Sequence, residues 1–415
     1  MELFKIILLI IKNRYLFWHC LSDNMRDKDF DIKEPKLKFK KTERVPPDGY
    51  NSSNEFFEDM YMDKDMIWMG QNTNHLHDDT IANAMIEAIK ENTFCRYPAP
   101  EGFSELKQLI LDDLGLKDLE VLLTSGATES LYLCMQALLE PEDNVILSDP
   151  GYFIIGDFAN RFAGEVRYVP IYFEENNYKL TPDLLRENMD ENTRMVILID
   201  PLNPLGSSYT EDELKEFAEI AKENDLYLLH DITYKDFARN HFLVENYAPG
   251  QTLTIYSFSK IFGMAGLRVG GVVSSKPIIK SIKNAVVNDL GVNIISQYGA
   301  IAGLKSKDQW FDKMRETCFE NQRLISKMIE PIEGVFLPVY PSDANMMAID
   351  LSGAGIDPKD MSNYLIEKKL FTREGEYTSE EFGDRYLRVS FSIPTEEVKI
   401  FCDVFPKAVE DLRTK

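Results

Sequence analysis

The spacing of apolar positions changes period many times between residues 121 and 287. Short apolar runs bounded by Gly, Pro, Asn or Asp predict buried strands, and the segments between them have apolar residues at helical spacing. Strands and helices alternate, which is the order that builds an α/β domain with a mostly parallel sheet flanked by helices. The predicted strands are 121–123, 144–147, 165–170, 194–199, 226–229 and 268–273, and the predicted helices are 130–138, 181–188, 211–224 and 276–287.

Further elements flank this alternating region. Residues 67–69 predict a short strand ended by Gly70, and residues 79–90 predict a helix with one apolar side. A long helix over 309–328 leads to a smaller α/β unit, with strands at 338–350 and 386–391 and helices at 358–368 and 395–412. Residues 26–64 are mostly polar and charged, so we expect an extended arm there.

The composition of the chain limits the kinds of molecule that it is expected to bind. A chain of 415 residues can form two or three domains, or one large domain with a smaller satellite. Its 69 acidic and 46 basic residues give a net charge of −23. This argues against nucleic acid as a partner, because phosphate backbones are bound by a surplus of Lys and Arg. An anionic substrate is repelled at long range, so any carboxylate or phosphate site must be local and built from arginine.

The cysteines and the amino-terminal segment give information on the cellular compartment of the protein. The five cysteines are odd in number and lack a Cys-x-x-Cys pair, which favours free thiols in a reducing cytoplasm. Residues 3–11 are apolar apart from Lys5, but they are fewer than half of the roughly 20 residues needed to span a bilayer. We expect no membrane association and no secretion, and we interpret residues 1–24 as a start-site artefact or a peripheral amphipathic arm.

Two histidines raise the question of a metal. His75 and His77 stand beside Asp78 and Asp79, but no further ligands cluster with them. We therefore interpret this stretch as a polar loop and expect no metal site.

The chemically richest stretch is residues 257–270, which read Ser-Phe-Ser-Lys-Ile-Phe-Gly-Met-Ala-Gly-Leu-Arg-Val-Gly. A lysine forms a Schiff base with an aldehyde cofactor, which makes Lys260 the candidate nucleophile, while Ser257, Ser259 and Arg268 offer donors for a phosphate. Pyridoxal phosphate carries both groups. An ordinary lysine at a strand or helix end is the alternative for an isolated Ser-x-Ser-Lys, but the glycines and Arg268 argue against it.

Polar and aromatic residues follow the ends of several other predicted strands. Gly126 lies in a turn at a helix start, where unpaired N–H groups and the helix dipole favour an anion, although many such turns bind nothing. Asp231 ends a strand, and its carboxylate would be paired if it faced a protonated pyridine nitrogen. That contact would keep the ring cationic and able to accept electrons. The alternative is that Asp231 is a helix N-cap. Asn203 follows a strand at the edge where open parallel sheets place ligands. Tyr152 is placed to stack on a ligand ring.

This stretch and the order of Gly126, Tyr152, Asn203, Asp231, Tyr234, Lys260 and Arg268 resemble the aminotransferase family of pyridoxal-phosphate enzymes with the aspartate-aminotransferase fold. The resemblance covers roughly residues 65–412. It implies an amino-terminal extension and arm over 1–64, a large cofactor-binding domain over 93–320, and a smaller α/β domain formed by 65–92 together with 321–415.

The resemblance also implies individual roles. Lys260 would hold the cofactor as a Schiff base, Asp231 would pair with its ring nitrogen, and Tyr152 would stack on the ring. Arg388, a lone arginine in an apolar strand, would bind the substrate α-carboxylate, although a snorkelling or salt-bridged arginine is the alternative. Leu205 departs from the Thr or Ser more frequent in the family and leaves Asn203 in place. The remaining implied contacts are Asn203 and Tyr234 at the ring oxygen, Gly126, Ala127, Thr128, Ser257, Ser259 and Arg268 at the phosphate, Gly70 and Asn203 at the substrate, and Tyr97 reaching the phosphate in the partner subunit.

The implied activity is transfer of an amino group between an L-amino acid and a 2-oxo acid, with 2-oxoglutarate expected, by a cytoplasmic homodimer. Residues 342–345 resemble histidinol-phosphate aminotransferases and threonine-phosphate decarboxylases, whereas residues 387–391 look more like aspartate and broad-specificity aminotransferases; a β-lyase would keep the same cofactor residues. A ligand-sensing regulator would need a DNA-binding module, which residues 1–64 do not suggest. The amino donor stays open, and Arg373 and Arg385 are the candidates for a second substrate arginine.

Overall fold

The computed structural model describes residues 49–287 and 290–413. Residues 1–24 and most of the expected arm lie outside the described residues. In the described part of the chain, no helix combines the length and apolar character that crossing a bilayer requires.

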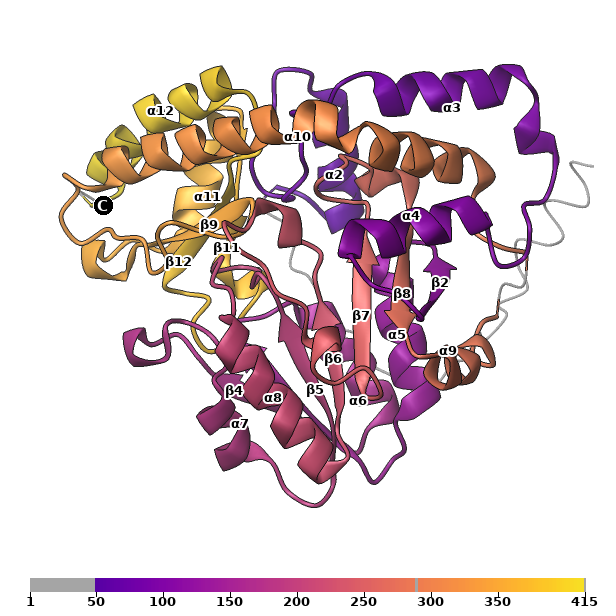
Figure 1. Cartoon of the computed structure of the whole chain (residues 1–415). Coiled ribbons are helices and arrows are strands. Elements are labelled where there is room, and N and C mark those ends of the chain that lie inside the picture. Colours follow the sequence, from indigo (N-terminus) through magenta and orange to yellow (C-terminus); the bar gives the residue numbers. More distant parts are fainter. Residues whose placement is uncertain (1–48, 288–289, 414–415) are drawn as a thin grey trace, which may run out of the picture. The chain divides into compact units, whose positions relative to one another are not determined.

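A seven-stranded sheet forms the centre of the described chain (Figure 1). Strand β8 is antiparallel to β2 and β7, and the other neighbouring pairs are parallel. The predicted fold class is therefore confirmed. In order across the sheet, the strands are β2 (Glu120–Thr124), β8 (Gly270–Ser274), β7 (Thr252–Ser257), β6 (Tyr227–Asp231), β5 (Thr193–Ile199), β3 (Asn144–Asp149) and β4 (Glu165–Pro170).

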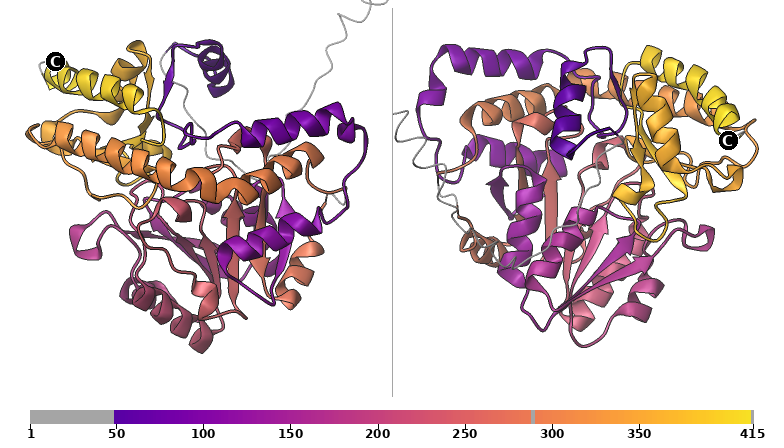
Figure 2. Two further views of the ribbon diagram at one scale, coloured as in Figure 1. Left: turned by 45° about the horizontal axis from the view of Figure 1, so that its top comes forward. Right: turned by 180° about the vertical axis from the view of Figure 1, so that it is seen from behind.

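Helices cover both faces of this sheet (Figure 2). Alternate side chains of β2 show the two faces, because Val121 and Leu123 belong to one apolar cluster and Leu122 belongs to another. The first cluster includes side chains of α4 (Ser104–Leu114) and α10 (Ile294–Ile329). The second includes side chains of α5 (Ala127–Leu138), α6 (Phe153–Phe162), α7 (Pro182–Asn188), α8 (Glu211–Asn224) and α9 (Lys276–Lys283).

The C-terminal segment forms a second, antiparallel sheet in the order β11 (Arg373–Glu374), β12 (Tyr386–Ser390) and β9 (Met346–Asp350). Helices α11 (Pro358–Glu367) and α12 (Thr395–Arg413) accompany it, and α10 packs against α12 as well as against α3 (Thr80–Lys90) and α4 (Figure 1). Strand β1 (Ile67–Trp68) pairs in parallel with β10 (Leu370–Phe371), so segments from both ends of the described chain meet here. The domain boundaries at 64, 92 and 320 stay predictions.

The expectation of an extended arm is wrong for its described end, because helix α2 (Ser53–Met62) forms there. The Ser52 side chain accepts a hydrogen bond from the Glu55 N–H and caps the helix. Phe56 and Met60, one turn apart, are buried against Phe371 of β10. The driving force for this helix is thus an apolar contact with a segment some 300 residues away in sequence.

Several boundaries also differ from the predicted ones. Strand β8 begins at Gly270 rather than 268, because Arg268 takes a left-handed backbone conformation with φ 52°. Strand β9 begins at Met346 rather than 338, because Pro338 and Pro341 lack the N–H that a ladder needs. Helix α9 ends at Lys283 rather than 287, where the Asn284 N–H bonds the carbonyl of Ser281 three residues back.

The amino-terminal half of α10 was missed, as were α4, α6 and β7. Buried positions in that half of α10 include Ser296, Gln297, Gly299 and Gly303, which show no apolar period. A Cβ on Gly303 would lie 3.1 Å from Ile81 Cδ1, so α3 packs closely there. The remaining 3₁₀ turns are η1 (Thr93–Cys95), η2 (Glu174–Asn176), η3 (Lys235–Phe237), η4 (Val244–Asn246), η5 (Ala265–Leu267), η6 (Ser352–Ala354) and η7 (Gly375–Tyr377).

Candidate active site

A cavity of about 320 Å³ lies where β5, β6 and β7 end, which is the edge where open parallel sheets bind ligands. Its volume lies within the range of about 300–1,000 Å³ that small-molecule sites occupy. The structure brings nearly all the predicted site residues together there. Those that line it are Gly70, Ala127, Thr128, Tyr152, Asn203, Asp231, Tyr234, Ser257, Ser259, Lys260, Arg268 and Arg388.

Lys260 follows β7 by three residues and lies among groups that oppose its protonation. Burial, and the nearby positive charges of Arg388 and Arg268, lower the pKa of its amine to about 7, although Asp231 acts in the opposite direction. Its Nζ donates to the carbonyl oxygen of Gln71 at 2.9 Å. A substantial fraction of this amine is therefore unprotonated at neutral pH, as a nucleophile requires.

The start of α5 forms one wall of the cavity. Gly126 is its N-cap with φ 88° and ψ 161°, a backbone conformation that favours glycine, and a Cβ there would lie 2.5 Å from Arg268 Nη2. The N–H groups of Ala127 and Thr128 belong to the first turn of α5, where backbone donors have no partner within the helix. With the Arg268 guanidinium above it, this helix start can hold an anion.

Asp231 and Tyr234 lie on the floor, at the end of β6 and just beyond it. Asp231 Oδ1 accepts hydrogen bonds from Thr233 Oγ1 at 2.6 Å and from Thr233 N at 3.1 Å. Burial raises the pKa of Asp231, although these bonds and Lys260 oppose the shift. Burial also raises the pKa of Tyr234 to about 12, and its hydroxyl accepts from Asn72 Nδ2 at 3.3 Å. Tyr234 is therefore a neutral hydroxyl at physiological pH.

Arg388 in β12 forms the opposite wall. Its Nη1 donates to Asn203 Oδ1 at 2.8 Å and its Nη2 donates to the Gly70 carbonyl at 2.6 Å. The Nε is buried without a hydrogen-bond partner, and no carboxylate of residues 49–287 or 290–413 forms an ion pair with this guanidinium. A buried cation held only by neutral acceptors is a strong site for an anion.

Two predicted residues do not line the cavity. Gly126 lies behind Arg268, where it shapes the helix start. Tyr97 is 79% exposed in the loop between η1 and α4 and does not line the cavity of its own chain. Its role in a partner subunit stays a prediction.

Several residues that line the cavity were not predicted from the sequence. Gln71, Asn72 and Thr73 follow Gly70 directly, and their polar run after a short strand was the available signal. Phe57 comes from α2, whose existence was not predicted. Of the two open arginines, Arg373 lines the cavity, whereas Arg385 stacks at 5.3 Å on the Tyr172 ring and does not line it. The other missed residues are Leu131, Ile199, Thr233, Ala265 and Tyr377.

The histidines near residue 75 make local contacts. His75 Nε2 lies 2.8 Å from Thr73 Oγ1, and His77 Nδ1 lies 3.2 Å from the Asp78 carbonyl. A different group of possible metal ligands, Asp200, His230 and His241, is brought together by the described part of the fold.

At the strand ends of an open α/β sheet, the cavity combines a buried lysine of lowered pKa with arginine side chains on two of its walls. Residues 64–405 match the model of the family described as aminotransferase class I and II. The chain therefore belongs to the class I and II aminotransferases, a family of pyridoxal-phosphate-dependent enzymes, and the predicted resemblance is confirmed.

Curated relatives cover most of the chain. The aspartate aminotransferase of Pyrococcus horikoshii is 28% identical over 343 residues, which cover 80% of this chain and 87% of the relative. Histidinol-phosphate aminotransferase 2 of Archaeoglobus fulgidus is 29% identical over 322 residues, covering 77% and 86%. Because these names carry different substrates, they leave the amino donor of this chain open.

Solved structures share the fold. The aromatic aminotransferase from Pyrococcus horikoshii has a TM-score of 0.75 at 23% identity and covers 86% of this chain and 98% of its own. The Thermus thermophilus aspartate aminotransferase with maleate has a TM-score of 0.70 at 23% identity, covering 81% and 88%.

Proposed function

We propose that this aminotransferase moves an amino group between an L-amino acid and a 2-oxo acid, with pyridoxal phosphate bound at Lys260. The observation that carries the proposal is the meeting of Lys260, Asp231, Arg268 and Arg388 in one cavity, where burial and the two arginines lower the pKa of the Lys260 amine to about 7.

The residues around the cavity fit this cofactor. The start of α5 and Arg268 form a cradle for a phosphate, in which the guanidinium lies close to Gly126. At the other end, burial of Asp231 is costly unless a cation faces it, and a protonated ring nitrogen is such a cation. Lys260 lies in the same cavity for the aldehyde.

Bound pyridoxal phosphate supplies an aldehyde that takes up the amino group and a ring that accepts negative charge from the substrate α-carbon. Lys260 Nζ would carry the proton from that carbon to the former aldehyde carbon of the cofactor, since a buried amine with a lowered pKa can take up and release a proton. Asp231 would keep the ring nitrogen protonated, and Tyr234 and Asn203, which line the same cavity, would hold the ring oxygen. Tyr152 would stack on the ring.

Arg388 orients the substrate. Its guanidinium is pre-organised by the Asn203 amide and the Gly70 carbonyl, so a carboxylate binds without ordering a flexible side chain first. A carboxylate held by Arg388 would keep the α-carbon within the cavity that Lys260 also lines.

A substrate with a second anionic group is favoured. Arg373 pairs with Arg388 across the β11–β12 ladder, so both side chains project from the same face of that sheet, and both line the cavity. Aspartate and histidinol phosphate, named for two relatives, each carry a second anion. The same holds for 2-oxoglutarate, the expected acceptor.

We further propose a cytoplasmic homodimer in which Tyr97 completes the partner's phosphate site. The exposure of Tyr97 supports an interface at this loop. The cysteines of the described chain, Cys95, Cys134, Cys318 and Cys402, are free thiols, which suits a reducing compartment.

The test is product analysis of the purified protein with pyridoxal phosphate, an amino donor and 2-oxoglutarate. We expect glutamate and a new 2-oxo acid as products, and a visible absorbance from the bound cofactor. Lys260→Ala is expected to abolish this absorbance and to lower the turnover rate at least about 1,000-fold. Lys305→Ala is the matched control, because that lysine pairs with Glu105 on the surface. Carbon dioxide or ammonia as product would favour a decarboxylase or a β-lyase, and a coloured, active Lys260→Ala protein would contradict the proposal.

A further inference from the structure

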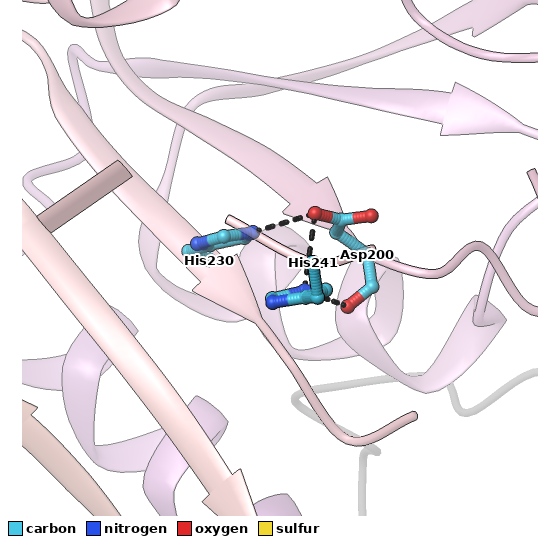
Figure 3. A group of neighbouring side chains, drawn as sticks. All are labelled: Asp200, His230 and His241. Carbon is cyan, nitrogen blue, oxygen red and sulfur yellow. Dashed lines mark hydrogen bonds and ion pairs between the residues drawn. The ribbon is translucent and has the colours of Figure 1, made fainter. Parts of the chain in front are cut away.

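Asp200, His230 and His241 form a cluster in which the first two are buried and the third is partly buried (Figure 3); Asp200 and His230 are next in sequence to the lining residues Ile199 and Asp231. Asp200 follows the end of β5, His230 is the residue before Asp231 in β6, and His241 lies beyond η3. The Nε2 atoms of both histidines lie 3.2 Å from Asp200 Oδ2, and His241 Nε2 also lies 3.2 Å from the Asp200 carbonyl oxygen. The two rings are nearly parallel, with centroids 5.7 Å apart.

Asp200 is the acceptor at the centre of this cluster. Its second oxygen, Oδ1, accepts from Ser208 Oγ at 2.5 Å and from Tyr209 N at 3.2 Å. Burial alone raises the pKa of a carboxyl group, but the two histidines outweigh that effect and hold the pKa of Asp200 well below its usual range. The cluster is thus built around a buried carboxylate with hydrogen bonds from His230, Ser208 and Tyr209, while His241 Nε2 lies near the same carboxylate and bonds the Asp200 carbonyl.

The contacts favour hydrogen bonding over metal binding. A histidine that ligates a metal almost always donates its other ring N–H to a partner. His230 Nδ1 is buried without any hydrogen-bond partner in the described chain. The carboxylate is also already satisfied by protein donors on both oxygens.

Asp200 connects two parts of the cavity through its backbone and its side chain. The Asp200 N–H donates to the Asp231 carbonyl at 2.9 Å, which joins the ends of β5 and β6. Its side chain closes the loop 200–209 by bonding Ser208 and Tyr209, and this loop carries Asn203. Asn203 in turn accepts the Arg388 hydrogen bond. The side chains of His230 and Asp231 point to opposite faces of β6, so the cluster supports the floor without entering the cavity.

We propose that Asp200, clamped by His230 and His241, is a positioning residue that fixes Asn203 for the cofactor and for Arg388 and fixes the strand end that carries Asp231. This inference rests on the proposed function. It adds three residues that do not line the cavity and that act only through lining residues such as Asn203 and Asp231.

The test uses Asp200→Asn in the full-length protein, because this change keeps the shape but turns one acceptor oxygen into a donor facing other donors. We expect the dissociation constant for pyridoxal phosphate and the KM for the amino donor each to rise about tenfold, since one buried acceptor is lost. Ser274→Ala is the matched control. It removes one buried hydrogen bond, from Ser274 Oγ to the Thr252 carbonyl, at the opposite end of the sheet.

A second pair of variants separates positioning from general loss of stability. His241→Gln keeps a donor close to the position of Nε2, and we expect both constants to stay within about threefold of the wild type. His241→Leu removes that donor and is expected to behave like Asp200→Asn. Thermal unfolding of the cofactor-free proteins identifies variants that fail to fold.

Two results would overturn the inference. The first is an Asp200→Asn protein that loses as much thermal stability as Ser274→Ala but keeps wild-type cofactor affinity and KM. The second is one equivalent of metal bound to the wild type and lost in Asp200→Asn. If the wild type itself binds no pyridoxal phosphate, the proposed function fails instead, so the two failures are distinguishable.

Discussion

Each arginine around Lys260 has two effects on the chemistry of the cavity. Arg388 and Arg268 offer sites for anions, and their charges also help to lower the pKa of the Lys260 amine. An anion bound to either arginine neutralises part of that charge, so the pKa of Lys260 rises when a substrate or phosphate arrives. Binding of an anion therefore makes the amine a stronger proton acceptor.

The residue-scale prediction concerns Arg373. Its guanidinium lies 4.4 Å from the centre of the Tyr377 ring, and that of Arg388 lies 5.8 Å from the same ring. We expect Arg373→Gln to lower kcat/KM for a donor with a second anionic group by about 100-fold, because one charge-assisted contact is worth roughly 1.5–3 kcal/mol. Steady-state kinetics with aspartate, histidinol phosphate and phenylalanine measure this, and phenylalanine is expected to change less than about threefold.

Arg385→Gln is the control, because Arg385 was an equal candidate in the sequence and stacks on Tyr172 instead. An equal loss for phenylalanine and aspartate in Arg373→Gln would show that Arg373 supports the cavity as a whole and does not select an anionic side chain.

At the scale of elements, the alternation of strands and helices predicted every strand of the large sheet except β7, since most of those strands are apolar runs between turn residues. Local pattern failed where burial depends on a distant partner. Helix α2 is stabilised by Phe371, and the first half of α10 is buried through glycine and polar residues against α3. Neither partner is visible within a window of one element.

The site was predictable to the extent that its residues follow strand ends. Asn203 and Asp231 have that local signal, whereas Lys260 was found through its neighbouring serines, glycines and Arg268; the structure brings the three residues together. Arg373 has none, because its position depends on the register between β11 and β12. His230 and Asp200 likewise meet only because β5 and β6 pair.

The element-scale prediction concerns η4, which buries Glu245. This side chain is 1% exposed, neither of its carboxyl oxygens has a hydrogen-bond partner in the described chain, and burial raises its pKa to about 9 from an ordinary value of 4.5. The folded protein therefore keeps a proton that the unfolded chain has lost between these pH values. The stability that this proton provides is complete below pH 4.5 and is lost as the pH rises toward 9.

We expect Glu245→Gln to raise the free energy of unfolding by roughly 3 kcal/mol at about pH 8 and to leave it nearly unchanged near pH 4. Urea unfolding across this pH range measures the change. Glu219→Gln, on the exposed side of α8, is the control and should leave the slope intact. A Glu245→Gln protein with the wild-type pH dependence would mean that a water molecule or a shift of η4 solvates the carboxylate.

At the scale of the whole molecule, the cavity joins the two ends of the described chain. Arg388 bonds the Gly70 carbonyl, and Ser390 Oγ accepts from the Asn72 N–H at 2.9 Å. Phe57 of α2 and Tyr377 line the same cavity. The site therefore requires nearly the full described length to fold, and the proposed homodimer would add Tyr97 from a second chain.

The whole-molecule prediction tests that addition by mixing two inactive variants. If Tyr97 serves the partner's site, a hybrid dimer of Lys260→Ala and Tyr97→Phe subunits has one site with both residues intact and one with neither. Random pairing makes half of the dimers hybrids, so equal mixing should restore about a quarter of the wild-type activity.

The assay is run at a pyridoxal phosphate concentration at which Tyr97→Phe alone is mostly empty, since losing one charge-assisted hydrogen bond weakens binding about tenfold. Subunits are exchanged by mild unfolding and refolding, with unmixed variants treated identically as controls. If Tyr97 acts within its own subunit, every hybrid site carries a defect and mixing restores nothing, and a monomer in sedimentation analysis would contradict the homodimer directly.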